Sequence, residues 1–181
     1  MKMEFVNGCF GKRIVCSDGV ERICNVVAVV THADGTEDAH LGANIVTDAG
    51  DRYYAEKACG QTPNSDFAAG GMRLGTGSTS PAKSDTDVTT FVTGSGKAVD
   101  ATYPKTADAD TDNSGAGTDI VTWRVSYATS EANSAGINEG AVVDNITTPT
   151  AAHCHWLFAA PFTKTSTDTL KVFVNHQFNG V

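Results

Sequence analysis

Basic side chains are scarce in this chain of 181 residues, which carries 13 Lys and Arg against 21 Asp and Glu. The formal net charge is −8 and the isoelectric point is near 4.9. The only adjacent basic pair is Lys12-Arg13. Because nucleic acids and anionic membranes bind proteins through clustered positive charge, this balance argues against both as partners. No apolar run approaches the roughly 20 residues that a membrane-spanning helix needs.

A regular disulfide framework is also missing. The five cysteines are an odd number at irregular spacing: Cys9, Cys16, Cys24, Cys59 and Cys154. The first residues lack the long apolar stretch of an export signal. We therefore expect synthesis in a reducing cytoplasm and buried, unpaired thiols.

Charged residues are only 19% of the chain, below the roughly 25% of ordinary soluble domains. Polarity must come instead from Thr, Ser, Asn and Gly, a composition typical of β-proteins. Turn signals recur about every dozen residues, which predicts a mainly β fold, an antiparallel sandwich or jelly roll. We expect Trp123 and Trp156 to supply core area, with a sugar-stacking platform as the alternative.

Hydrophobic periodicity predicts one helix, over 47–59, capped by Thr47 or Asp48. A hairpin is expected within 12–31, with its turn at Ser17-Asp18-Gly19. Further strands are expected over 88–93, 97–103, 120–127, 141–143, 155–162 and 170–178. Residues 1–46 are predicted to form an N-terminal arm or hairpin and residues 47–181 the β domain, with a single domain as the alternative.

An acidic loop suggests a cation site. Asp108, Asp110, Asp112 and Asp119 occupy positions one, three, five and twelve of a twelve-residue window, and such oxygen spacing suits calcium. Asn113, however, stands where the calcium loop needs glycine, and position twelve lacks the usual Glu. The alternative is a solvated loop whose residues favour turns.

His153-Cys154-His155 offers imidazole and thiol groups that zinc can bind. Strand alternation places the two histidines on one face and Cys154 on the other. No Cys-x-x-Cys pair completes a site, and the sequence does not indicate whether His32, His40 or His176 contributes. We therefore expect strand residues near a subunit contact. Because no Gly-x-Ser-x-Gly elbow or phosphate-binding loop is found either, we predict that the chain is not an enzyme.

Residues 73–87 form the most distinctive stretch, an apolar run that breaks into Gly75-Thr76-Gly77, then Pro81-Ala82 and Ser84-Asp85-Thr86. The two glycines are expected to provide unusual backbone angles. This segment resembles one found in virion proteins of tailed bacteriophages. Four more segments carry the same resemblance: 97–105, 120–127, Gly136-Ile137-Asn138-Glu139-Gly140-Ala141, and the closing 162–165 with 170–174.

The resemblance implies a virion component that is assembled in the bacterial cytoplasm and binds major capsid or tail proteins. A capsid decoration (cement) protein is the first expectation, and a homo-oligomer, with a trimer as the first guess, is expected with it. The alternatives are a tail-associated or fibre-attachment protein, or a glycan- or receptor-binding module with a bound cation. The resemblance brings no catalytic residues and no cofactor.

Overall fold

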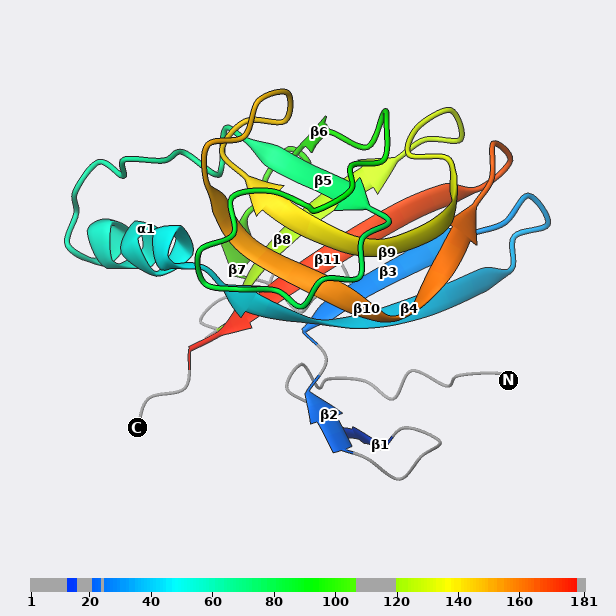
Figure 1. The fold of residues 1–181 in the computed structure, drawn as a ribbon, viewed down its shortest axis with the longest axis horizontal. Helices are drawn as coiled ribbons and strands as arrows, with labels where there is room; N and C mark the ends of the chain where they lie inside the picture. The colour runs from blue at the N-terminus through cyan, green and yellow to red at the C-terminus, as the bar shows by residue number, and fades with distance from the viewer. Residues whose placement is uncertain (1–12, 16–20, 24, 107–119, 179–181) are drawn as a thin grey trace.

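The computed structural model describes residues 13–15, 21–23, 25–106 and 120–178, and Figure 1 shows it as a mainly antiparallel β protein. The mainly β prediction is confirmed, whereas a sandwich or jelly roll is not: nine strands form one curled sheet in the order β6-β5-β9-β10-β4-β3-β11-β8-β7. The strands are β3 (Val26–Thr31), β4 (Glu37–Val46), β5 (Gly71–Gly75), β6 (Lys97–Ala98), β7 (Lys105–Thr106), β8 (Ile120–Tyr127), β9 (Ser134–Val143), β10 (Ala152–Lys164) and β11 (Thr169–Gln177). A separate two-stranded sheet contains β1 (Arg13–Val15) and β2 (Glu21–Ile23).

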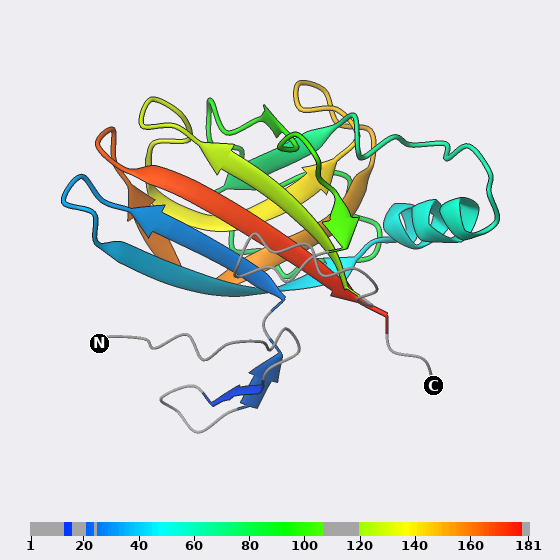
Figure 2. The same ribbon diagram turned by 180° about the vertical axis from the view of Figure 1, so that it is seen from behind.

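The sheet curls so that the regions at its two ends lie beside each other. In Figure 1 β5, β9 and β10 lie toward the viewer, and in Figure 2 β8, β11 and β3 do. The segment around β6 borders β8, because the Tyr127 hydroxyl donates to Ser95 O at 3.0 Å and Asp100 N donates to Arg124 O at 2.9 Å. The curled sheet therefore encloses the buried side chains of the core.

Large side chains from several strands fill this core. Trp123 and Trp156 are both fully buried, so the expectation that they supply core area is confirmed. Strand β8 has the bounds predicted for it, with Trp123, Val125 and Tyr127 buried and the intervening Arg124 and Ser126 half-buried. This alternation follows from the period of two along a strand that has one buried face.

The predicted helix is present as α1 (Asp48–Ala58). The Thr47 side chain accepts from Gly50 N at 3.1 Å, as an N-cap should. Asp51 lies in the first turn and Lys57 in the last, where each charge favours the helix dipole. Among the described residues, no helix has the length and hydrophobicity for crossing a membrane.

Strands β3 and β4 lie inside the nine-stranded sheet, between β11 and β10. They come from the predicted N-terminal unit, residues 1–46, and they pair with strands of residues 47–181. Their position agrees with the alternative of one domain. The predicted hairpin turn at 17–19 lies outside the described residues, although β1 and β2 pair antiparallel on either side of it.

The strand predicted over 88–93 is wrong. Only a single bridge, between Gly75 and Phe91, forms there among these residues. The reason is that the amides of Thr89 and Thr90 donate to a side-chain carboxylate, that of Glu139, rather than to a neighbouring strand. The strand predicted over 97–103 stops at Ala98, because the chain turns where Tyr103 N donates to Asp100 O. Strands β9 and β10 are longer than predicted.

The expectation of buried thiols is confirmed for Cys154 and wrong for Cys59. Cys154 is fully buried in the core, whereas Cys59 is exposed at the C-terminal end of α1. The position of Cys59 follows from its backbone role as the helix C-cap, since its amide donates to Ala55 O. The other three cysteines lie outside the described residues.

Two glycines of β9 test how tightly the sheet packs on the core. A Cβ added to Gly140 would overlap the indole ring of Trp156, whereas a Cβ added to Gly136 would meet nothing within 4 Å. We expect Gly140→Ala to lower the free energy of unfolding by about 1–3 kcal/mol, because the buried indole cannot move without displacing its neighbours. Gly136→Ala is the matched control and should leave stability unchanged or slightly raised. Urea denaturation measures both, and equal midpoints for the two variants would contradict this packing.

Candidate functional site

Two of the segments that carry the resemblance, 73–87 and 136–141, meet at one buried carboxylate, that of Glu139 on β9. Its Oε1 accepts from Gly77 N at 2.9 Å and from Thr90 N at 2.8 Å, and its Oε2 accepts from Thr89 N at 3.1 Å. Glu139 has no exposed surface. A carboxylate buried this deeply requires such donors, since an unpaired charge is very costly away from water.

His155, on the neighbouring strand β10, joins Glu139 to the loop. Its Nε2 lies 3.0 Å from Glu139 Oε2, and its Nδ1 lies 2.6 Å from Asp85 Oδ2. Since ionised carboxylates only accept hydrogen bonds, both ring nitrogens donate and the imidazole is charged. We call Glu139, His155 and Asp85 the Glu139 cluster.

The environment shifts the pKa of both buried members of the Glu139 cluster. Burial alone would raise the pKa of Glu139, but the hydrogen bonds from His155 and from the Thr90, Thr89 and Gly77 amides outweigh burial and lower it to about 2. Burial alone would lower the pKa of His155, yet its hydrogen bonds to Glu139 and Asp85 and their negative charges raise it. Both shifts favour the charged forms of the pair, a Glu139 carboxylate and a protonated His155.

Gly75 and Gly77 are needed for space rather than for backbone angles. A Cβ at either position would overlap the Glu139 carboxylate group. Neither glycine has a positive φ, so the predicted role in supplying unusual backbone angles is wrong. The physical reason for the glycines is the close approach of the 75–77 backbone to the carboxylate that it binds.

Arg73 fastens the other end of the same loop. Its Nη1 donates to Ile146 O and Thr147 O at 3.2 Å each, and its Nε lies 3.0 Å from Asp87 Oδ1. The guanidinium covers the ring of Phe91, 3.7 Å from the centroid. Together with the Glu139 cluster, Arg73 holds residues 76–91 against β9 and β10, where the green loop crosses the sheet in Figure 1.

The three residues His153, Cys154 and His155 are divided differently from the prediction. A register shift in the pairing of β10 with β9 falls between Ala152 and Cys154, so His153 occupies an irregular position. His153 and Cys154 both belong to the core side, whereas His155 faces the loop. The expectation that His153 and His155 share a face is wrong, because a bulge breaks the period of two.

The bulge brings His153 and Cys154 close to His176 of β11. One ring nitrogen of each histidine and Cys154 Sγ all lie within 4.8 Å of one another. Burial lowers the pKa of His153 well below its ordinary value and that of His176 to about 4. Burial also raises the pKa of the Cys154 thiol to about 12. Among the described residues these side chains form the one group with the residue types and spacing of a metal site.

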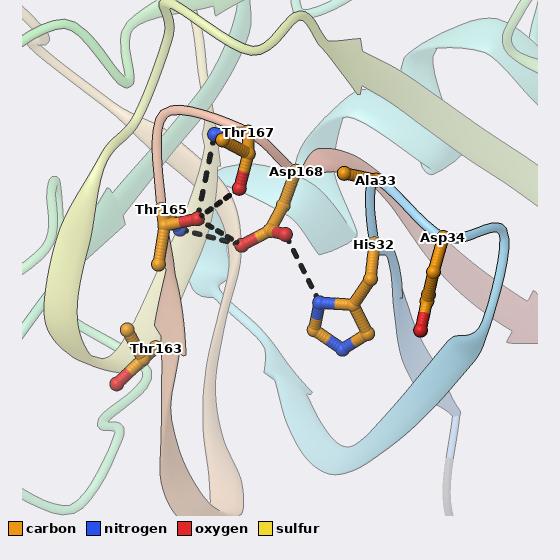
Figure 3. Close-up of a pocket in the computed structure, with 7 residues that line it drawn as sticks. All are labelled: His32, Ala33, Asp34, Thr163, Thr165, Thr167 and Asp168. Atoms are coloured by element: carbon orange, nitrogen blue, oxygen red, sulfur yellow. Dashed lines mark hydrogen bonds and ion pairs between the residues drawn. The ribbon is translucent and has the colours of Figure 1, made fainter.

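A pocket of about 450 Å³ lies between two hairpin turns, and Figure 3 shows the residues that line it. His32 lies between Asp168 and Asp38, 3.0 and 3.1 Å from their oxygens. Asp168 also accepts from the amide and hydroxyl of Thr165, both at 2.7 Å, which lowers its pKa to about 2. The pKa of His32 is raised by its hydrogen bonds to Asp38 and Asp168. These contacts tie the turn between β10 and β11 to the turn after β3.

The predicted calcium ligands, Asp108, Asp110, Asp112 and Asp119, lie outside the described residues. The calcium loop therefore stays a prediction. The sequence did not indicate the Glu139 cluster, although Glu139 and Asp85 both occur in segments quoted for the resemblance. A signal that could have found it is the pair of closely spaced glycines with a lone Glu inside an otherwise apolar strand.

Comparison of the chain with models of protein families, with curated proteins and with solved structures gave no match.

Glu139→Gln is expected to lower the free energy of unfolding by about 3 kcal/mol at pH 6, because it leaves His155 charged beside an uncharged partner. The depressed pKa of Glu139 stabilises the fold above the ordinary Glu value of 4.5, and this contribution is lost as pH falls from there toward 2. Because the pKa of His155 is raised, its contribution to the stability of the fold is fully present below pH 6.5. This contribution is lost as pH rises through the raised pKa. Urea denaturation from pH 2 to pH 9 measures both limbs.

The control for this variant is Glu37→Gln, at an exposed position that begins β4. It should change stability by no more than about 0.5 kcal/mol at any of these pH values. An acid limb that is equally steep in Glu139→Gln and in the parent would show that Glu139 is not the group that titrates.

Proposed function

We propose that this chain is a non-enzymatic structural component of a tailed-bacteriophage particle, and that it acts as a capsid decoration protein. It would bind copies of itself, with a trimer as the expected state, and the major capsid protein. The resemblance described above is the origin of this proposal, and the arrangement around Glu139 is the observation that supports it.

The Glu139 cluster joins two of the segments that resemble virion proteins, and these contacts hold the fold together. Gly77 and Asp85 come from one segment and Glu139 from another, and their polar groups are satisfied by each other and by His155. A catalytic group needs a proton acceptor or nucleophile that can reach a substrate. Glu139 and His155 are instead buried and fully engaged, which favours a role in positioning the 76–91 loop.

The edges of the sheet suit association in closed oligomers. In the described part of the chain, the outermost strands, β6 and β7, have two residues each. Such short edges offer few unpaired backbone groups, so open-ended sheet extension is disfavoured. Contacts with copies of the chain or with shell proteins would then use loops and strand faces, as a discrete symmetric assembly requires.

Counting the chain in purified particles tests the proposal. We expect hundreds of copies per particle by quantitative mass spectrometry against labelled peptides, because a decoration protein repeats over the head shell. Light scattering after size exclusion should give three chains for the purified protein. A dozen copies or fewer would favour the alternative of a neck, tail or fibre-attachment protein.

The control is the major capsid protein of the same particles, whose copy number calibrates the measurement. Absence of the chain from the particles would overturn the proposal. A receptor-binding module would be favoured instead if the particles carried few copies and the purified chain bound glycans only when calcium was present.

A further inference from the structure

His153, Cys154 and His176 form a cluster of soft ligands inside the core, which we call the HCH cluster. His153 and Cys154 come from β10 and His176 from β11, two strands that are separated by β4 and β3 in the sheet. The curl of the sheet brings them together, with one ligand atom of each within 4.8 Å of the others. The three residues are 0%, 0% and 6% exposed.

His153 has an unusual environment for a histidine. Both of its ring nitrogens are buried and neither has a hydrogen-bond partner among the described residues. Its ring stacks on His176 with a centroid separation of 4.9 Å and an interplanar angle of 10°. The rings of Tyr53, Tyr54, Phe67 and Trp123 surround it, with centroids 4.7–5.5 Å away. Buried polar atoms are nearly always paired, so two unpaired nitrogens on one ring indicate a missing ligand.

The other two acceptors share one donor, the side-chain amide of Asn44. Asn44 Nδ2 lies 2.6 Å from His176 Nε2, and the Asn44 side chain also hydrogen-bonds with the Cys154 thiol. On the far side of the His176 ring, Nδ1 lies 2.6 Å from the Tyr54 hydroxyl. A cation that replaced the amide would keep Tyr54 as the outer contact that metal-binding histidines commonly make.

We propose that the HCH cluster binds one thiophilic divalent cation, with Zn²⁺ as the physiological candidate. Two imidazoles and a thiolate form a ligand set that zinc prefers, whereas calcium and magnesium require oxygen ligands. Binding forms two N–metal bonds and one S–metal bond, and the thiol proton leaves to solvent. Tetrahedral zinc holds its ligand atoms roughly 3.3–3.8 Å apart, so the three atoms must draw together by about 1 Å. The fourth position is left for water.

Cobalt spectroscopy tests the proposal in the full chain with Cys9, Cys16, Cys24 and Cys59 all changed to Ser, so that Cys154 is the sole thiol. We expect one Co²⁺ per chain with a near-ultraviolet sulfur-to-cobalt charge-transfer band, and displacement of that band by Zn²⁺. Saturating Zn²⁺ at about 100 times its Kd should raise the Tm by about 5–10 °C. Absence of the charge-transfer band in this protein would overturn the proposal.

Two further variants in this background separate loss of the site from loss of the fold. His153→Phe replaces the ring with an apolar one of similar size, so the metal-free variant should melt at or above the parent temperature while binding weakens at least about tenfold. His40→Gln is the control, because His40 stacks on Phe162 outside the HCH cluster and its loss should leave binding unchanged. Unchanged affinity in a folded His153→Phe variant would also overturn the proposal. Neither outcome depends on where the chain resides in a particle.

Discussion

The structure depends on one buried carboxylate and the groups that neutralise it. Glu139 lies where β9 passes under the 76–91 loop, and it accepts from backbone amides that would otherwise lack partners. A loop of this length that crosses a sheet has many polar backbone groups, and each must be satisfied. The charge of Glu139 satisfies several at once, and His155 balances that charge. A hydrogen-bonded buried pair of this kind specifies a single loop position, because every other position would leave a charge unpaired.

Strand β10 contributes residues to both the Glu139 cluster and the HCH cluster, on opposite faces. His155 faces the loop, while His153 and Cys154 face the core, and the bulge after Ala152 makes this division possible. Without the bulge, His153 and His155 would lie on the same face of β10. Both rings would then be on the side of the loop, and His153 would not reach the core. The irregular residue thus separates an ionised histidine, which holds the loop, from a neutral one among aromatic rings.

Local patterns were sufficient for much of the fold. The helix was predictable because Thr47 is a capping residue, with Asp51 in the first helical turn and Lys57 in the last. These signals act within a few residues along the chain. Strand β8 was predictable because apolar and polar residues alternate from Val121 to Tyr127, and burial alternates from Trp123 onward. Strand β4 was not expected, since its residues are mostly half-exposed and show little alternation. Pairing with β3 and β10 on either side decides its conformation.

The sequence by itself determined the mainly β composition, the helix, the acidic character and the strands with regular alternation, because these depend on residue types and short spacings. The tertiary structure alone decided that Gly75 and Gly77 make room for Glu139, that His153 turns into the core, and that His176 approaches it from a distant strand. Each of these depends on contacts between segments far apart in the chain. Spacing along the sequence contains no information about how a sheet curls or where its register shifts.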